Sequence, residues 1–122
     1  MGFSVIVLES NSAAAKSLAG ELSSPFQSVL MTNSSDELRQ RIATERPNAV
    51  VLDMECSRLI DVRHLHRDFP ALPIVCTHRH PDDELWIAAL EAGASDVCRA
   101  EDVQNSLASI LQSVPRANRA FA

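Results

Sequence analysis

The sequence predicts an α/β fold, a three-layer α/β/α sandwich built on a five-stranded parallel sheet. Five strand-like segments alternate strictly with five segments of helical periodicity along the 122 residues. Such alternation requires crossover connections, which place helices on both faces of a parallel sheet. In addition, Val5–Leu8 and Ala49–Leu52 are continuous apolar runs, which is typical of strands that are covered on both faces.

The first strand is expected at about Ser4 to Leu8, where the residues are β-branched or aliphatic. Asn11 or Ser12 then caps a first helix. The apolar stripe of this helix repeats at helical spacing and consists of Ala15, Leu18 and Leu22. Pro25 follows the end of the helix, and a short second strand is expected at about Gln27 to Met31.

The second helix is expected to start at Ser34 or Ser35, because acidic residues follow immediately and are favoured in a first turn. Leu38 and Ile42 face inward. A proline at position 47 marks the end of the helix, since the residue before a proline avoids the helical conformation. The third strand is then expected at about Asn48 to Leu52.

The third helix is expected to begin at Ser57 or a neighbouring residue. Its apolar face consists of Val62, Leu65 and Phe69. The fourth strand is expected at about Ile74 to Thr77. Pro81 suits the first position of a fourth helix, and Gly93 is expected as the left-handed residue at its end.

The fifth strand is expected at about Ser95 to Arg99, and the fifth helix at about Asp102 to Val114. The inward positions of this helix are Val103, Leu107, Ile110 and Val114. Residues 1–114 therefore form one domain by length, and residues 115–122 are a tail or the start of a linker. The strand order expected for such a doubly wound sheet is the flavodoxin-like order 2-1-3-4-5.

The composition excludes several classes of function. The net charge is −5 and no run of Lys or Arg occurs, so binding of nucleic acid by this segment is not expected. No apolar run is long enough to cross a bilayer, and the N-terminus lacks the pattern of a signal peptide. We therefore expect a cytoplasmic protein that does not contact a membrane. With only three glycines, no glycine-rich nucleotide-binding loop can be written.

The three cysteines do not form a CxxC pair. Because their number is odd, a disulfide framework is not expected, and reduced, mostly buried thiols are the favoured interpretation. Cys76 and Cys98 lie on strands that are expected to be adjacent. A redox pair between them is an alternative, although paired strand positions rarely meet disulfide geometry.

Two strands end in a carboxylate. Glu9 follows the first strand and Asp53 follows the third. The carboxyl ends of parallel strands meet at one edge of the sheet, where open α/β folds place their binding sites. If the two strands are neighbours, the two carboxylates share a crevice that suits a hard cation and a phosphoryl group.

Three segments carry a resemblance to a known family. Pro47–Asp53, Ala71–Val75 and Ala88–Asp96 resemble the acceptor strand, the entry to the fourth strand and the lead into the fifth strand of response-regulator receiver domains of two-component signalling. The resemblance covers about residues 3 to 114. It implies that Asp53 accepts a phosphoryl group from a histidine kinase or a phosphotransfer protein, with Mg²⁺ present. It also allows a C-terminal output domain outside this chain.

The acidic positions of the family are only partly kept. Where the family places two acidic residues after the first strand, this chain has Glu9 and Ser10. Ser10 offers a neutral oxygen, so the Mg²⁺ site should be weak. The metal ligands that the resemblance implies are Glu9, Asp53 and Glu55.

The switch positions depart further. Counting from Pro73 and from Gly93 places His78 at the family's hydroxyl position, with Thr77 one residue early and on the other face of the strand if the register shifts by one. Counting from Gly93 places Ala100 at the family's lysine position, with Arg99 one residue early. Thr77 and Arg99 are therefore the candidate site residues beside Asp53. The aromatic switch position is Val97, so the chain resembles an atypical receiver, or pseudo-receiver.

Two alternatives to a phosphorylated switch remain. The first is a phosphorylation-independent dimerisation or docking domain that uses the face of the fourth helix, fifth strand and fifth helix. Trp86 and Leu90 form an apolar stripe there, beside the core-facing stripe, and tryptophan is favoured at binding hot spots. A homodimer through this face is then expected. The second alternative is a small enzyme, but no nucleophile–base pair or cofactor motif supports it, and we expect no enzymatic activity.

Overall fold

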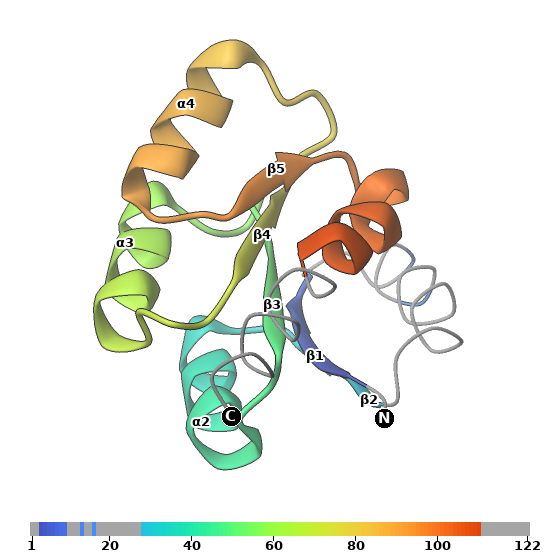
Figure 1. The fold of residues 1–122 in the computed structure, drawn as a ribbon, viewed down its shortest axis with the longest axis vertical. Helices are drawn as coiled ribbons and strands as arrows, with labels where there is room; N and C mark the ends of the chain where they lie inside the picture. The colour runs from blue at the N-terminus through green and yellow to red at the C-terminus, as the bar shows by residue number, and fades with distance from the viewer. Residues whose placement is uncertain (1–2, 10–12, 14–15, 17–27, 111–122) are drawn as a thin grey trace, which may run out of the picture.

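The computed structural model describes residues 3–9, 13, 16 and 28–110 (Figure 1). Its strands form one five-stranded parallel sheet in the order β2-β1-β3-β4-β5, which confirms the predicted fold class and strand order. The predicted caps and stripe of the first helix lie outside the described residues, as do Val114 and the predicted tail. The strands are β1 (Ser4–Leu8), β2 (Ser28–Thr32), β3 (Ala49–Asp53), β4 (Ile74–Thr77) and β5 (Asp96–Cys98).

The strand bounds differ from the predicted ones by small shifts. The third strand ends at Asp53 rather than Leu52, because Asp53 is paired with Thr77 of β4. The peptide N–H of Met54 then donates to the carbonyl of Thr77 at 2.8 Å. The acceptor candidate is therefore the last residue of a regular strand, which fixes its backbone.

Helices cover both faces of the sheet. The helices α2 (Ser35–Glu45), α3 (Leu59–Asp68) and α4 (Asp83–Ala92) lie on one face, to the left of the sheet in Figure 1. A short 3₁₀ turn, Ala100–Asp102, leads into a helix whose described part spans residues 103–110 on the other face. This arrangement is the predicted three-layer sandwich.

The two faces of the sheet carry separate apolar cores. Alternate residues of β3 separate into the two cores, with Val50 and Leu52 facing α2, α3 and α4 and Val51 facing the helix over 103–110. The predicted inward residues Leu38, Ile42, Val62 and Leu65 are buried in the first core. Val103 and Leu107 are buried in the second. This period of two also decides which strand-end side chains share a face.

The third helix starts beside Ser57, as predicted, whereas the predicted start of the fourth helix is wrong. Arg58, the neighbour of Ser57, is the cap of α3. Ser57 itself donates its N–H back to the carbonyl of Asp53 at 3.0 Å, and its side chain is buried. The helix starts two residues later, and Asp61 accepts a hydrogen bond from the N–H of Arg58 at 2.8 Å. Pro81 is not the first residue of α4. Asp82 caps that helix instead, since its carboxylate accepts the N–H of Leu85 at 2.8 Å.

The other helix ends follow the sequence. Ser34 caps α2 and accepts a hydrogen bond from the N–H of Glu37 at 3.2 Å. Gly93 follows α4 with a φ of 121°, a backbone conformation that glycine adopts without strain. Among the described residues, no helix is long and apolar enough to cross a membrane.

Candidate functional site

The carboxyl ends of β1, β3 and β4 bring three polar side chains to one edge of the sheet, which we call the rim. Glu9, Asp53 and Thr77 stand there and expose only 8%, 6% and 2% of their surface. Buried polar groups are retained where they have partners or a function. The rim is therefore the leading candidate for the functional site.

Glu9 and Asp53 occupy equivalent positions on neighbouring strands. Leu8 of β1 is paired with Leu52 of β3, and each acidic residue comes next in its strand direction. Neighbouring strands lie roughly 4.8 Å apart. The structure thus brings the two predicted carboxylates to adjacent places at the rim.

Asp53 is held by the loop that follows it. The N–H of Glu55 donates to its Oδ1 at 3.0 Å. The backbone carbonyl of Asp53 accepts the N–H groups of Cys56 and Ser57 at 3.2 and 3.0 Å. These bonds fold the loop into a turn and fix the orientation of the carboxylate.

Thr77 lies on the same face of the sheet as Asp53. The two residues are Cα partners, and the residues two positions earlier, Val51 and Val75, belong to the same core. Thr77 therefore faces the same side of the sheet as Asp53, because the register between β3 and β4 has no shift at this point. The hydroxyl of Thr77 donates to the carbonyl of Leu52 at 3.5 Å, which is a long contact.

Glu55 and Arg79 form an ion pair across the rim. The Nε and Nη2 atoms of Arg79 lie 3.3 and 3.2 Å from Oε2 of Glu55, and the N–H of Arg79 donates to Oε1 at 3.2 Å. The pair joins the loop after β3 to the loop after β4. Arg79 was not among the predicted site residues. Its only signal was a cation two residues beyond the end of a strand.

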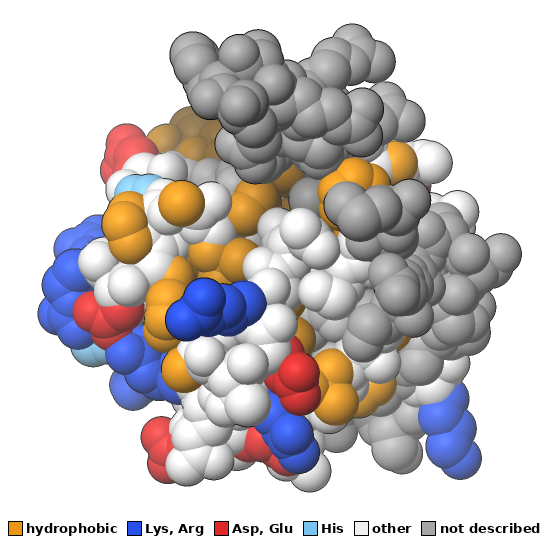
Figure 2. Space-filling model, turned by 60° about the horizontal axis from the view of Figure 1, so that its bottom comes forward, with side chains coloured by type: hydrophobic (Ala, Val, Ile, Leu, Met, Phe, Trp, Pro, Cys, Tyr) orange, Lys and Arg blue, Asp and Glu red, His pale blue; other side chains and the backbone are white. Residues whose placement is uncertain are grey.

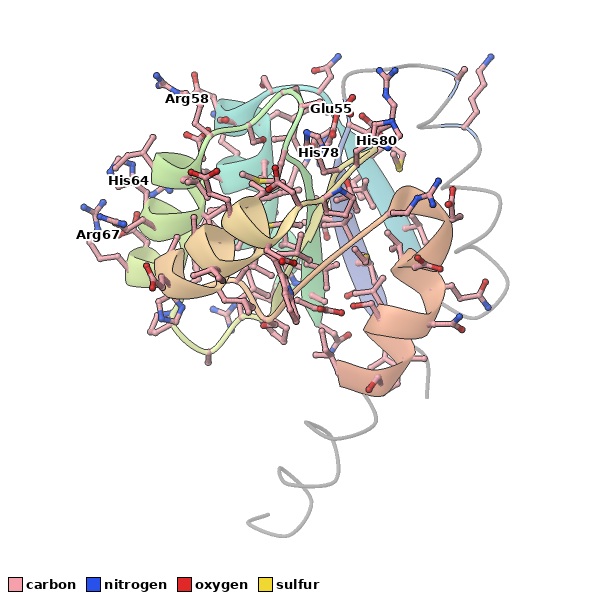
Figure 3. The ribbon with its side chains drawn as sticks, turned by 90° about the horizontal axis from the view of Figure 1, so that it is seen from above. Glu55, Arg58, His64, Arg67, His78 and His80 are labelled. Carbon is pink, nitrogen blue, oxygen red and sulfur yellow. The ribbon has the colours of Figure 1, made fainter. Side chains whose placement is uncertain are left out.

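Two histidines lie beside this ion pair. The N–H of His80 donates to Nδ1 of His78 at 3.0 Å, so Nδ1 acts as an acceptor. Figure 3 shows Glu55, His78 and His80 gathered at the rim, whereas His64 and Arg67 extend from α3 at the side of the molecule. His78 is thus a loop residue whose ring accepts a hydrogen bond from the backbone of His80.

Arg99 lies at the far end of the rim. It follows β5, and its Nε atom lies 2.9 Å from Oε1 of Glu101. Its side chain is largely exposed. The structure therefore places this predicted site residue beside Glu101, two strands away from Asp53.

The donor set of the rim fits a weak Mg²⁺ site. Mg²⁺ is usually held by one or two carboxylates together with water and phosphate oxygens, and Glu9 and Asp53 supply two. The side chain of Glu55 is engaged with Arg79. No group of three or more His, Cys, Asp or Glu side chains within the described part of the chain is arranged to hold a metal ion. The side chains of the three predicted ligands, Glu9, Asp53 and Glu55, thus do not converge on one point in this structure.

The exposed apolar surface of α4 contains one residue more than predicted. Trp86 and Leu90 are 46% and 40% exposed, and Ile87 is 55% exposed beside them. Ile87 was missed because the sequence reading followed the stripe at i, i+4, whereas Ile87 lies one residue further round the helix. Together these three residues form the α4 patch.

The cysteines do not form a redox pair. Cys76 is buried in the core under α2, α3 and α4, whereas Cys98 packs against the core on the other face. None of the three cysteines, all of which lie in the described part of the chain, forms a disulfide bond. Burial raises the pKa of Cys76 to about 12 and that of Cys98 to about 11, so both remain protonated at neutral pH.

A cleft of about 630 Å³ lies at the opposite edge of the sheet from the rim. Figure 2 shows this side of the molecule, with hydrophobic side chains gathered near its middle. The lining residues precede β3 and β4 instead of following them, and they include Ile42, Arg46, Phe69 and Leu72. Among the residues that the structure describes, no carboxylate lines the cleft, and these lining residues are separate from those of the rim.

Comparisons with known proteins agree with this fold. No protein-family model matches the chain. An uncharacterized 76.5 kDa protein from Thiocystis violacea is 24% identical over 122 residues, a match that covers 96% of this chain. The chain spans only 18% of the length of that relative.

Solved structures of receiver domains are similar along nearly the whole chain. A signal receiver domain assigned to a LuxO repressor protein of Vibrio parahaemolyticus matches with a TM-score of 0.87 and 14% identity, covering 100% of this chain and 99% of that one. The receiver domain of RcsB from Salmonella enterica serovar Typhimurium, solved with phosphomimetic beryllofluoride, matches with a TM-score of 0.79 and 13% identity. That match covers 92% of this chain and 90% of the other. The chain therefore has the receiver-domain fold.

Proposed function

We propose that this chain is a signal-transduction receiver module in which Asp53 accepts a phosphoryl group. The observation that carries the proposal is the position of Asp53. It is the last residue of β3 in a receiver-domain fold, it is buried at the rim, and it lies beside Glu9 and opposite Thr77. A buried carboxylate with a fixed backbone is a suitable nucleophile once incoming charge is neutralised.

The donor is a histidine kinase or a phosphotransfer protein. An oxygen of Asp53 attacks the phosphorus of a phosphohistidine, so that a P–O bond forms while the P–N bond breaks. The electron pair of the broken bond stays on the imidazole nitrogen of the donor. Because the N–H of Glu55 holds Oδ1, Oδ2 is the oxygen that is directed toward the incoming group.

Glu9 and Asp53 are the residues that would hold Mg²⁺, which supplies neutralisation of the phosphoryl charge when it is bound. The site keeps one acidic residue after β1 where receiver domains place two, so weak binding is expected. An output domain outside this chain would read the phosphorylated state.

A titration with Mg²⁺ and then beryllofluoride, followed by amide NMR, tests this proposal. Beryllofluoride stands in for a phosphoryl group on an aspartate. Saturable shifts around Asp53 that disappear in Asp53→Asn are expected. If neither Mg²⁺ nor beryllofluoride changes the spectrum at millimolar concentration, the domain is not a phosphorylation switch.

The α4 patch favours a second candidate function, a dimerisation or docking domain that works without phosphorylation. Trp86, Ile87 and Leu90 are large apolar side chains on the exposed side of one helix, and such patches mark interaction sites. Light scattering over a range of concentrations should show a rising mass that Trp86→Ala lowers. Ile60→Ala is the control, because Ile60 is equally exposed but lies on α3. A variant at Trp86 that keeps the wild-type mass would exclude this role.

A further inference from the structure

We propose that Arg79 is the cation that binds the phosphoryl group at Asp53, a role that the resemblance to receiver domains would give to Arg99. This inference rests on the proposed function of Asp53. It adds a phosphoryl-binding residue from the loop after β4. It also assigns to Glu55 the role of binding Arg79 while Asp53 is unmodified.

Arg79 is already tied to the loop that positions Asp53. Glu55 donates its N–H to Oδ1 of Asp53 at 3.0 Å and at the same time binds the guanidinium group of Arg79 through Oε2. A single residue thus connects the acceptor carboxylate to the cation. Through Glu55, the guanidinium group is thus linked to the residue on which the phosphoryl group would be attached.

The sheet register places Arg79 in the loop that follows β4, the strand next to the acceptor strand β3. Thr77 is the Cα partner of Asp53, and Arg79 follows it by two residues, as Glu55 follows Asp53. Neighbouring strands lie roughly 4.8 Å apart, which an arginine side chain easily spans. The carbonyl of Cys98 accepts the N–H of His78 at 3.1 Å and fixes the start of this loop.

Arg99 is placed less favourably. It follows Cys98, which is the partner of Thr77 on β5, so two strand spacings, or roughly 10 Å, separate it from β3. Its guanidinium group lies 2.9 Å from Glu101 and faces that carboxylate. To bind at Asp53, Arg99 would have to break this pair and cross the end of β4.

The contact between Arg79 and Glu55 is easily exchanged. The side chain of Arg79 is 76% exposed, and ion pairs between exposed side chains contribute little stability. A phosphoryl group on Asp53 adds negative charge and several acceptor oxygens at the rim, and a guanidinium group binds such oxygens in a bidentate manner. Arg79 therefore leaves Glu55 for the phosphoryl group when Asp53 is modified.

The movement of Arg79 from Glu55 to the phosphoryl group is transmitted to the α4 patch through the backbone. Only two residues, His80 and Pro81, separate Arg79 from Asp82, the cap of α4. A displacement of Arg79 toward Asp53 pulls on this short loop and on the first turn of α4, which is followed by Trp86. The chain thus has a route from Asp53 to an exposed surface that needs no aromatic switch residue on β5.

The experiment is a beryllofluoride titration at saturating Mg²⁺, followed by Trp86 fluorescence and by ¹⁹F NMR of the bound species. Arg79→Gln is expected to weaken beryllofluoride binding about tenfold, since a charge-assisted bidentate contact is lost. Arg79→Lys should recover only part of the loss. Arg63→Gln is the control, because it removes a cation from an exposed position on α3.

Glu55→Gln provides an independent arm. It frees Arg79 from its ion pair, so beryllofluoride should bind a few times more tightly, or as tightly as before, with a smaller change in Trp86 fluorescence. If the wild type binds and Arg99→Gln weakens binding while Arg79→Gln does not, the assignment to Arg79 is overturned and the proposed function stands. If the wild type does not bind beryllofluoride at all, the proposed function fails and this inference fails with it.

Discussion

Gly93 lies directly against the side chain of His66. A Cβ atom on Gly93 would come within 2.4 Å of Cγ and 2.6 Å of Cβ of His66, and the φ of Gly93 is 121°. The glycine thus serves two purposes. It allows the backbone to turn from α4 toward β5, and it lets α3 approach α4 closely.

Gly93→Ala is therefore expected to lower the free energy of unfolding by about 2 kcal/mol or more, through backbone strain and overlap. Urea unfolding measures the loss. The double variant with His66→Ala separates the two causes, since only the overlap is relieved. If the double variant is as unstable as Gly93→Ala, backbone strain alone explains the effect.

A second prediction concerns the tie between β5 and the helix over 103–110. The hydroxyl of Ser106 donates to Oδ2 of Asp96 at 2.6 Å. Ser106→Ala should lower the free energy of unfolding by about 1.5 kcal/mol, because the carboxylate loses a partly buried donor. Ser109→Ala, at an exposed position of the same helix, should change it by less than about 0.5 kcal/mol. Equal effects of the two substitutions would contradict the assigned role of Ser106.

The thiols should differ in reactivity. Cys56 is exposed, whereas Cys76 is buried and Cys98 is half-buried. At pH 8 an alkylating reagent should modify Cys56 first, because burial keeps the other two thiols protonated. Mass spectrometry of digested protein identifies the modified residue. If Cys76 were modified as fast as Cys56 in the folded protein, the core that contains Cys76 would be accessible to the reagent, and the prediction would be contradicted.

The raised pKa values of the two less accessible thiols make the free energy of unfolding depend on pH. The pKa values of Cys76 and Cys98 rise from 9.0 to about 12 and about 11 on folding. A thiol with a raised pKa stabilises the folded state below its unfolded pKa, and this contribution is lost as the pH rises through the folded value. The free energy of unfolding should therefore fall from pH 9 upward, and it should fall less in Cys76→Ala than in the wild type, when each is compared with its own value at pH 8.

At acidic pH the relevant group is Asp68. Ion pairs with Arg67 and Arg39 lower the pKa of its carboxyl from 3.8 to about 2. A lowered pKa stabilises the folded state above the unfolded value, so the contribution is lost as the pH falls from about 4 toward 2. Asp68→Asn should remove this part of the acid dependence. The effect should be small and should shrink at high salt, because the group is exposed to solvent.

The fold could be predicted because each element depends on local pattern. The apolar runs that end in Glu9 and Asp53, and the alternation of strands with helices, are sufficient for a parallel sheet. The helix starts were harder to predict than the strands. Both Ser57 and Asp82 are good capping residues, and which residue caps a helix depends on the loop that precedes it. The loop after Asp53 folds back onto its carbonyl, which moves the start of α3 beyond Ser57.

The site was predicted less completely than the fold. The place of Asp53 beside Glu9 follows from strand order, whereas the face of Thr77 follows from the register between β3 and β4, which residue counts alone do not give. The pairing of Glu55 with Arg79 joins two loops that lie 24 residues apart in the chain. No local sequence pattern indicates such a contact, so Arg79 could be identified as a candidate site residue only from the three-dimensional structure.

The most direct test of the central claim is the intact mass of the protein after incubation with Mg²⁺ and a small phosphoryl donor such as acetyl phosphate. We expect that the wild type gains the mass of one phosphoryl group, that hydroxylamine removes it as expected for an acyl phosphate, and that Asp53→Asn gains none. A wild-type protein that stays unmodified, or an Asp53→Asn variant that is modified to the same extent, would contradict the claim that Asp53 is the acceptor.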